Sequence, residues 1–502
     1  MGVVTSHKVS MRYVGDPLLT GGASLCCRLL PAVPFHLVEA PLSQKERTAM
    51  VSSRLQGEKN YQDLSKGHRW FLLILVSIGS SIIYAPAYLK AVFYDPLLQA
   101  LGVTNTELGA VFGAYAIAAL VCYLPSGILA DKVRMRTLSS LGFVSTAILT
   151  FVYAALPSIQ VLFAIFILMG ITTILIWWGV RYKLVRLISR EDEYPKRIGL
   201  SYGIYGVAGL VIGFISTGIV AAVGQNLGLG VSIYLAFLGT IILILGILSF
   251  LFIPKFQGEI KKGGGFNLSE FTVAFRNPVV WLAAISLFFV YFFYTGVTYT
   301  TPYLTGVLGA SLIVTTIIAN IRNYGITLLS GPIFGFIANK AKPSLVIVAG
   351  SITFVIALAA LAFLPTGAAV IVIAATLIIL LGFIANGTFG VVSAQLTEGR
   401  VPLHYFGAAT GILSVIGFLP DTFSSIWFGR IMDAQTDING IVAAGAFQQI
   451  FLILIAAAVL AAISSLILFL YVKKHRAPQE GQLEAAREPQ HESLQEAHAD
   501  SK

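Results

Sequence analysis

The sequence predicts an all-α membrane protein with twelve transmembrane helices in two parallel six-helix repeats. Three observations lead to this prediction: the composition, the number of long apolar segments, and a motif that recurs 208 positions along the chain (335 − 127). Of the 502 residues, 57% are hydrophobic and 11% are charged, whereas about 25% of the residues of an average soluble protein are charged. The mean hydropathy of +0.84 therefore excludes a water-soluble globular protein.

The apolar segments are long enough to cross a bilayer. A helix needs roughly 20 residues, at 1.5 Å each, to cross about 30 Å of hydrocarbon. Because lipid offers no partners to backbone polar groups, each segment is expected to be a helix. The predicted spans are residues 70–98, 107–130, 137–156, 159–188, 197–223, 231–253, 278–305, 311–338, 343–364, 367–395, 406–432 and 444–472.

The distribution of basic residues predicts the orientation of these spans. With the N-terminus inside, the six outer loops contain no Lys or Arg, and lysine and arginine accumulate on the cytoplasmic side of membrane proteins. Both termini are therefore predicted to be cytoplasmic. This topology also explains the net charge of +10, so no nucleic-acid partner is expected. The inner loops contain Lys132, Arg134, Arg136, Arg186, Arg190, Lys196, Arg197, Lys255, Lys261, Lys262, Arg276, Lys340, Lys342 and Arg400.

The two ends of the chain differ from the spans in composition. Residues 1–69 form a predicted cytoplasmic segment without the apolar core of a signal peptide. Met50 precedes a polar lead into the first span, so residues 1–49 are either translated or an overcalled start. Residues 473–502 are rich in glutamate and are predicted to be a disordered cytoplasmic tail.

Two predicted halves flank a central linker. Residues 70–253 and 278–472 each contain six spans, and an even number of spans per half makes the repeat parallel, with its axis along the membrane normal. Residues 254–277 are the cytoplasmic linker. Within it, Leu268, Phe271 and Phe275 share one face of a predicted short helix at the membrane surface. We expect this helix to act as a tether.

The repeated motif resembles a known family. Residues 127–132 read Gly-Ile-Leu-Ala-Asp-Lys, and residues 335–340 read Gly-Phe-Ile-Ala-Asn-Lys. Together with the two halves and the long linker, this pattern over residues 70–472 resembles the major facilitator superfamily, which implies a secondary transporter. Arg134 and Met135 depart from the family pattern, which usually has glycine and a basic residue there. Further stretches are similar to bacterial facilitators with organic-anion relatives, which implies the bacterial inner membrane: residues 177–186, 322–325 and 414–421.

Asp131 is a predicted gating residue. A carboxylate near a helix N-terminus is stabilised by about 0.3–1 kcal/mol, and the family resemblance implies that it engages basic residues when the cytoplasmic side is closed. The alternative is that the charges around it only fix topology. Because Asn339 carries no charge, the second copy of the motif is expected to form the weaker latch. The gating candidates are Gly127, Asp131, Arg136, Arg186, Gly335 and Asn339, with Arg190 as a further cationic partner of Asp131.

Charged residues within the spans are the main candidates for a solute site. A charge near the bilayer midplane costs about 2.5–3.5 kcal/mol, and Lys90, Arg322 and Asp421 lie within spans. The planar fork of Arg322 suits a carboxylate or phosphate, and with Lys90 it predicts an anionic solute that bridges the halves. Two alternatives remain open, that Arg322 and Asp421 only neutralise each other and that Lys90 snorkels outward. Arg181 and Lys183 either join the site or snorkel to the cytoplasmic surface.

Polar aromatic side chains could complete this pocket. The remaining predicted solute-binding residues are Trp178, Tyr291, Tyr294, Tyr324 and Asn386. Tyr299 and Tyr303 suit the membrane interface better.

Asp421 also permits proton coupling, because a buried carboxylate can be protonated in one state and ionised in another. Pairing with Arg322 would oppose this. No other cofactor is expected. The predicted partners are a small-molecule solute and membrane lipid, and the predicted assembly is a monomer.

Other function classes lack the residues that they need. An intramembrane enzyme generally requires a histidine, a metal cluster or paired acids within a span, and all seven histidines fall outside the predicted spans. The three cysteines show no metal-ligand spacing, and no phosphate-binding loop for ATP occurs. A transporter of a neutral, sugar-like solute and a non-transporting receptor on the same fold remain as alternatives.

Overall fold

The computed structural model describes residues 57–191, 193–224, 226–260, 268–438 and 440–499, with side chains in the last helix up to His475. The predictions for residues 1–56, which include the alternative start at Met50, lie outside the described residues. The description that follows concerns the compact unit from Lys59 onward.

The described chain is almost entirely helical. The long helices and short helical turns before the linker are η1 (Tyr61–Asp63), α2 (Lys66–Ile82), η2 (Leu89–Ala91), α3 (Tyr94–Leu101), α4 (Asn105–Lys132), α5 (Met135–Ala154), α6 (Ile159–Gly170), η3 (Ile171–Trp178), α7 (Gly179–Leu187), α8 (Tyr194–Ala222) and α9 (Leu227–Phe252). Those from the linker onward are α10 (Leu268–Arg276), α11 (Pro278–Gly296), η4 (Val297–Tyr299), α12 (Thr300–Gly306), α13 (Leu312–Asn320), η5 (Ile321–Gly325), α14 (Thr327–Ala341), α15 (Pro343–Ala362), η6 (Ala368–Val370), α16 (Ile371–Val392), α17 (Gln395–Glu398), η7 (Leu403–Tyr405), α18 (Phe406–Gly417), α19 (Pro420–Asp433) and α20 (Ala444–Ala499).

Eleven helical stretches among the described residues are long and apolar enough to cross a membrane. They agree with eleven of the predicted spans to within a few residues. The first predicted span, residues 70–98, is divided, because α2 ends at Ile82 and a turn precedes η2 and α3. Pro86 lies in this turn, and proline has no N–H to continue a helix. The protein is therefore an integral membrane protein, and the prediction of one continuous first helix is wrong.

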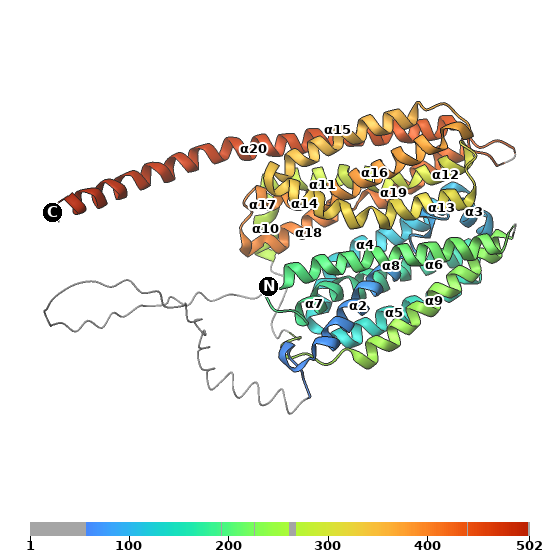
Figure 1. Cartoon of the computed structure of the whole chain (residues 1–502), viewed down its shortest axis with the longest axis horizontal. Coiled ribbons are helices and arrows are strands. Elements are labelled where there is room, and N and C mark those ends of the chain that lie inside the picture. Colours follow the sequence, from blue (N-terminus) through green and yellow to red (C-terminus); the bar gives the residue numbers. More distant parts are fainter. Residues whose placement is uncertain (1–56, 192, 225, 261–267, 439, 500–502) are drawn as a thin grey trace, which may run out of the picture. The chain divides into compact units, whose positions relative to one another are not determined.

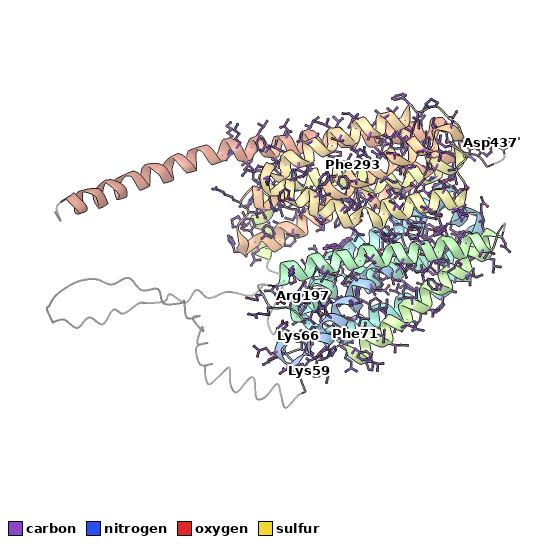
Figure 2. The ribbon with its side chains drawn as sticks, viewed as in Figure 1. Lys59, Lys66, Phe71, Arg197, Phe293 and Asp437 are labelled. Atoms are coloured by element: carbon purple, nitrogen blue, oxygen red, sulfur yellow. The ribbon has the colours of Figure 1, made fainter. Side chains whose placement is uncertain are left out.

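The apolar side chains face two environments. Large residues such as Phe293 are fully buried between helices, while Val121, Leu251 and Val372 are exposed on the outside of the bundle. Apolar groups on an outer helix surface are compatible with lipid around them. Figure 2 shows Phe293 among the helices that follow the linker.

In Figure 1 the helices from α2 to α9 lie together, and those from α11 to α20 form a second group. Within the first group α5 packs along α9, and within the second α20 packs along α11 and α15. The most extensive contact between the two groups joins α4 to α19, and α8 also packs on α13. The arrangement as two repeats stays a prediction.

The two ends of the bundle carry different residues. At the end that we call the linker end lie α10 and α17 (Figure 1), together with Lys66 and Arg197 (Figure 2). The opposite end holds α3, α12 and Asp437. The predicted linker helix is present as α10, and Phe271 on it lies against α18 near Gly411. The segment predicted as a disordered tail continues α20 to Ala499.

The close contact between α4 and α19 depends on glycine. A Cβ atom at Gly109 would lie 2.3 Å from the carbonyl oxygen of Ser425, and one at Gly429 would lie 2.5 Å from that of Asn105. Both neighbours are backbone atoms, which cannot move without shifting a helix. Small residues allow membrane helices to approach in this way.

We expect Gly109→Ala to destabilise the protein by about 1–3 kcal/mol, the usual range for overpacking. The measurement is the thermal unfolding midpoint of the purified protein. Gly127→Ala on the same helix is the control, because a Cβ there would meet no atom within 4 Å. Equal midpoints for the two variants would show that α4 and α19 do not need this contact.

Candidate functional site

The predicted site residues lie where helices are irregular. Lys90 is in η2, the short turn that follows the break after α2. Trp178 ends η3 and Arg322 lies in η5, and both segments are π-helical interruptions of membrane spans. Asp421 lies in the first turn of α19, just after the break from α18. Such irregularities often occur at functional sites, because they redirect side chains and free backbone groups.

Lys90 and Asp421 converge on one face of α19. The Lys90 Nζ donates a hydrogen bond of 2.5 Å to Ser425 Oγ, and the Tyr291 hydroxyl donates one of 2.6 Å to Asp421 Oδ2. Asp421 and Ser425 are one helical turn apart, so their side chains share a face. Lys90 also lies 3.7 Å from the ring centre of Phe112. Lys90 is only 7% exposed, so it does not snorkel outward.

Arg322 is bonded to neutral acceptors on both sides of the linker. Its Nη1 donates to the carbonyl oxygen of Val297 at 2.9 Å and to the hydroxyl of Thr300 at 2.7 Å. Its Nη2 donates at 2.8 Å to the carbonyl oxygen of Ala91, which is the neighbour of Lys90. No carboxylate of the described chain lies within ion-pair distance of Arg322, so the alternative of a pair between Arg322 and Asp421 is not realised.

Aromatic rings connect Trp178 to Asp421. The ring of Tyr123 lies 5.3 Å from Trp178 and 5.2 Å from Phe418. Phe418 in turn lies 4.7 Å from Tyr291, which binds Asp421. The residues therefore form one continuous layer that starts on η3 and ends on α19.

The other predicted pocket residues occupy the surroundings of this layer. Tyr294 stacks on Phe389 at 4.7 Å, and Asn386 Oδ1 accepts from Thr327 at 3.3 Å. Tyr299 and Tyr303 are each 3% exposed. They are packed inside the protein, which corrects their assignment to the membrane interface.

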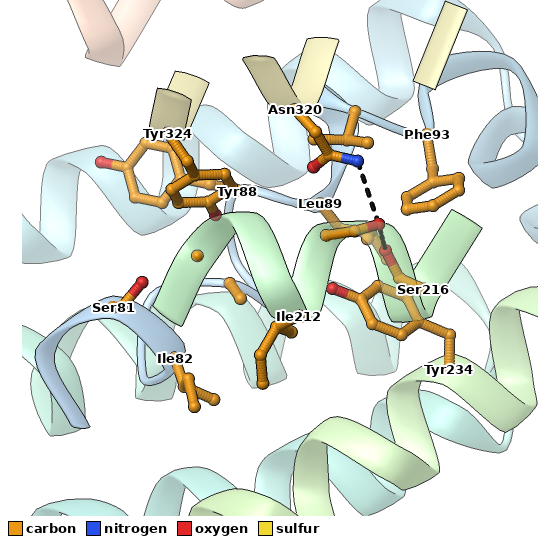
Figure 3. A pocket seen from close by; sticks show the side chains of 14 residues that line it. Ser81, Ile82, Tyr88, Leu89, Phe93, Ile212, Ser216, Tyr234, Asn320 and Tyr324 are labelled. Carbon is orange, nitrogen blue, oxygen red and sulfur yellow. Dashed lines mark hydrogen bonds between the residues drawn. The ribbon is translucent and has the colours of Figure 1, made fainter. Parts of the chain in front are cut away.

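Two cavities lie between helices on either side of the linker. A small one of about 20 Å³ is enclosed by α8, the first helices and Asn320 and Tyr324. In Figure 3, Asn320 and Tyr324 lie over the stretch of α8 that carries Ile212 and Ser216. The volume of this small cavity is enough for about one water molecule. A larger cavity of about 210 Å³ lies nearer the linker end, and we call it the linker-end cavity. It is lined by Tyr123, Leu124, Trp178, Gly407, Thr410, Gly411 and Ser414.

The opposite end of the bundle is closed by hydrogen bonds between the two helix groups. Asp433, the last residue of α19, accepts from the backbone N–H groups of Asn105 at 3.0 Å and Thr106 at 2.8 Å. It also accepts from both of their side chains. Asp433 thus caps the N-terminus of α4, where a negative charge is favourable. Nearby, the hydroxyl of Thr305 donates to Asp95.

At the linker end, Asp131 accepts from Lys183 at 2.9 Å. Lys183 was predicted either to join the site or to snorkel, and it pairs with Asp131, the predicted gating residue, instead. Arg186 lies 3.7 Å from Glu191, and the Arg136 guanidinium lies 4.3 Å from the ring centre of Phe250.

The second copy of the motif differs from the first in its contacts. Asn339 is exposed, and the N-terminus of α15 is capped by Glu398, which accepts from the N–H of Ser344 at 2.9 Å. A Cβ at Gly335 would meet no atom within 4 Å. The acidic group that caps α15, Glu398, therefore lies outside the second copy of the motif.

Sequence reasoning missed Asp433, Ser425, Tyr123, Phe112 and Phe418. The capping role of Asp433 had a partial signal, because Thr104 and Glu107 begin a helix with a capping box,. Nothing in the sequence indicates that an acid 328 residues further on (433 − 105) reaches that helix end.

The comparisons with known proteins agree with a transporter fold. The model of the Major Facilitator Superfamily matches residues 70–425. Inner membrane protein YqcE of Escherichia coli (strain K12) is 28% identical over 410 residues, which are 80% of this chain and 95% of YqcE. Inner membrane protein YihN of the same strain is 25% identical over 379 residues, covering 74% of this chain and 90% of YihN.

Two solved structures share the fold. A bacterial homologue of the human lysosomal transporter Spinster, in an inward-facing and unoccupied conformation, has a TM-score of 0.64 at 15% identity and covers 82% of this chain and 98% of its own. The nucleoside transporter NupG has a TM-score of 0.61 at 16% identity and covers 80% of this chain and 99% of its own.

Proposed function

Because this chain belongs to the Major Facilitator Superfamily, we propose that it is a secondary transporter that moves a small organic anion across a bacterial inner membrane by alternating access. The family is one of non-enzymatic transporters, and the relatives YqcE and YihN are named as inner membrane proteins. The anionic solute, the two rocking six-helix repeats and the orientation are our proposal.

The balance of buried charge carries the proposal of an anionic solute. Lys90 and Arg322 are both buried between helices of the two groups, and Asp421 is a buried carboxylate one helical turn before Ser425, the partner of Lys90. Within the described chain, neither cation has a carboxylate within ion-pair distance. Buried charges in a membrane protein require partners, and the excess of one positive charge favours an anion at this place.

The contacts at the two ends support an inward-facing state. We assign the linker end to the cytoplasm, because Lys66 and Arg197 lie there (Figure 2) and lysine and arginine favour that side,. The opposite end is closed by the cap of Asp433 on α4, while the linker-end cavity is the larger of the two. A solute bound near Lys90 would then leave or enter through the linker-end cavity.

Asp421 and Lys90 also provide a means of coupling. A proton on Asp421 would remove the carboxylate that lies beside Lys90 and would change the charge that the solute meets. We infer that an inward proton gradient accelerates uptake. The Tyr291 hydroxyl donates to Oδ2 of Asp421, and a carboxylate has a second oxygen that can take a proton.

The test is uptake of labelled organic acids, sugar acids and neutral sugars into proteoliposomes at two pH gradients. We expect saturable uptake of an anion by the wild type and loss of it in Lys90→Gln, which removes the charge and keeps a polar side chain. The matched control is Lys196→Gln, because Lys196 is an exposed residue of α8. This variant should leave uptake unchanged. Uptake of neutral solutes alone, unaffected by Lys90→Gln, would contradict an anionic substrate.

Asp131 gives a separate prediction about gating. Asp131→Asn removes a partly exposed ion pair with Lys183, which is worth about 0.2–1 kcal/mol. We therefore expect little change in the thermal unfolding midpoint and a fall in uptake of up to about fivefold, because each 1.4 kcal/mol of lost bias between the two states changes their ratio tenfold. Glu191→Gln, which breaks the exposed pair with Arg186, is the control. Unchanged uptake in Asp131→Asn would remove Asp131 from the gate.

A further inference from the structure

Arg181 on α7 is a buried cation surrounded by tyrosines. Its side chain is only 9% exposed, and its guanidinium carbon lies 4.1 Å from the ring centre of Tyr202 and 5.3 Å from that of Tyr205. Tyr182, the next residue along α7, has its ring centre 5.9 Å away. Stacking on ring faces stabilises the charge but satisfies none of the N–H groups in the guanidinium plane.

Two nitrogen atoms of Arg181 have no acceptor. Both Nε and Nη2 are buried, and no atom of the described chain accepts a hydrogen bond from them. An unsatisfied buried donor is unfavourable, and more so when it carries charge. Nε and Nη2 form one edge of the guanidinium, and this edge matches the two oxygens of a carboxylate or phosphate.

The other basic groups nearby are already engaged. Lys183 pairs with Asp131 at 2.9 Å. Arg322 uses its Nε on Asn323 at 3.2 Å and its Nη1 and Nη2 on other neutral acceptors. Of the buried arginines in the described spans, Arg181 is thus the one whose Nε and Nη2 have no hydrogen-bond acceptor.

Arg181 lies about one helical turn after Trp178, which lines the linker-end cavity. The hydroxyls of Tyr182 and Tyr202 are 3.0 Å apart and join α7 to α8. The ring of Tyr182 lies 5.9 Å from that of Trp178, which lines the cavity. On the other side of Arg181, the ring centre of Tyr205 lies 6.4 Å from that of Tyr324 on η5, a helix that follows the linker in the chain. The arginine therefore lies beside the junction of the two helix groups.

We propose that Arg181 forms a second oxyanion site at the linker end, where Nε and Nη2 bind the carboxylate or phosphate group of the solute between the central site and the cytoplasm. The inference rests on the proposed transport of an anion. The tyrosine rings cover the faces of the guanidinium and leave its edge for the ligand. Tyr202 is partly exposed, at 42%, so an anionic lipid headgroup offers the same chemistry from another source.

The experiment titrates inorganic phosphate and gluconate into the purified full-length protein in phosphatidylcholine nanodiscs, with tryptophan fluorescence as the readout because Trp178 is close to the site. We expect saturable binding of at least one of these probes by the wild type. Arg181→Gln should weaken it at least tenfold, and Arg181→Lys should lie between the two, because lysine keeps the charge without the fork. Lys196→Gln should bind like the wild type.

Three results would overturn the site. These are no saturable response in the wild type, unchanged affinity in both Arg181 variants, and an Arg181-dependent response to phosphatidylglycerol nanodiscs but to neither solute. The last result would assign the site to lipid headgroups. Because Arg181→Lys retains a charge at this position, it allows the test if Arg181→Gln fails to fold.

Uptake measurements separate this inference from the proposed function. If Arg181→Gln loses binding while the wild type transports no anion, the second oxyanion site is supported and anion transport fails. If the wild type transports an anion that Arg181→Gln binds with unchanged affinity, the transport proposal stands and the site at Arg181 fails.

Discussion

Arg322→Ala is expected to abolish uptake of the transported anion, with a loss of about 100-fold or more. The side chain donates to the carbonyl oxygens of Val297 and Ala91 and to the hydroxyl of Thr300. Each hydrogen bond to a charged group contributes roughly 1.5–3 kcal/mol, so the loss of two corresponds to at least about 100-fold at 1.4 kcal/mol for each factor of ten. The carbonyl oxygen of Ala91 also loses one of its two donors, with the Thr301 hydroxyl remaining at 3.2 Å, which loosens the turn that carries Lys90.

The measurement compares initial uptake rates in proteoliposomes, with the amount of folded protein checked by size-exclusion chromatography. Arg322→Lys keeps the charge but cannot reach three separate acceptors, so we expect it to recover only a small part of the rate. Asn323→Ala is the matched control, because it removes the acceptor of Nε alone. If Arg322→Ala transports the anion at the wild-type rate, Arg322 neither binds the solute nor positions Lys90.

Asp433→Asn is expected to open the end of the bundle opposite to the linker. The carboxylate accepts four hydrogen bonds from Asn105 and Thr106, and an amide offers one acceptor oxygen and no charge. Loss of a cap costs about 0.5–2 kcal/mol, which shifts the equilibrium between closed and open states roughly 2-fold to 30-fold.

The shift can be measured by alkylation of Met432→Cys in a background without the native cysteines. Met432 is buried at this end, with its sulfur 3.8 Å from the hydroxyl of Tyr94. A membrane-impermeant maleimide should label it faster in Asp433→Asn. Glu107→Gln is the control, because Glu107 lies in the same first turn of α4 but bonds only to Thr104. Equal labelling rates in all three proteins would show that the cap does not close this end.

The helices were predictable because hydropathy and length determine them. In lipid, the backbone polar groups of a long apolar segment must form their hydrogen bonds within the protein. Few structures other than a helix meet this requirement. The break in the first span was not predicted, although Pro86 was visible in the sequence. Proline is tolerated in many membrane helices, as Pro125 in α4 and Pro332 in α14 show, so its presence alone does not decide whether a helix ends.

The charged residues of the candidate site were predictable from the sequence, but the residues that they contact were not. Lys90, Arg322 and Asp421 were found because a charge in a span is rare, and the structure brings Lys90 and Asp421 to one face of α19. The partners Ser425 and Ala91 are ordinary residues, and a neutral hydroxyl or carbonyl gives no signal in the sequence. Lys183, which pairs with Asp131, was not among the predicted partners of that carboxylate.

The contacts differ between the two ends of the bundle. At the opposite end, Asp433 joins the two helix groups through hydrogen bonds to backbone atoms, and Arg322 does the same at the candidate site. At the linker end, the ion pair of Asp131 stays within the first group, between α4 and α7. An anion bound at the centre could favour closure of the linker end by drawing the groups together.

The central claim is that binding of an anion closes the linker end and opens the opposite end. The most direct test measures two distances by electron-electron double resonance in nanodiscs, with and without the transported anion. One spin-label pair replaces Gln99 and Ile438 at the opposite end, and the other replaces Lys132 and Lys340 at the linker end, all of which are exposed. We predict that the anion lengthens the first distance and shortens the second. If both distances stay unchanged, or change in the same direction, alternating access around the central site is contradicted.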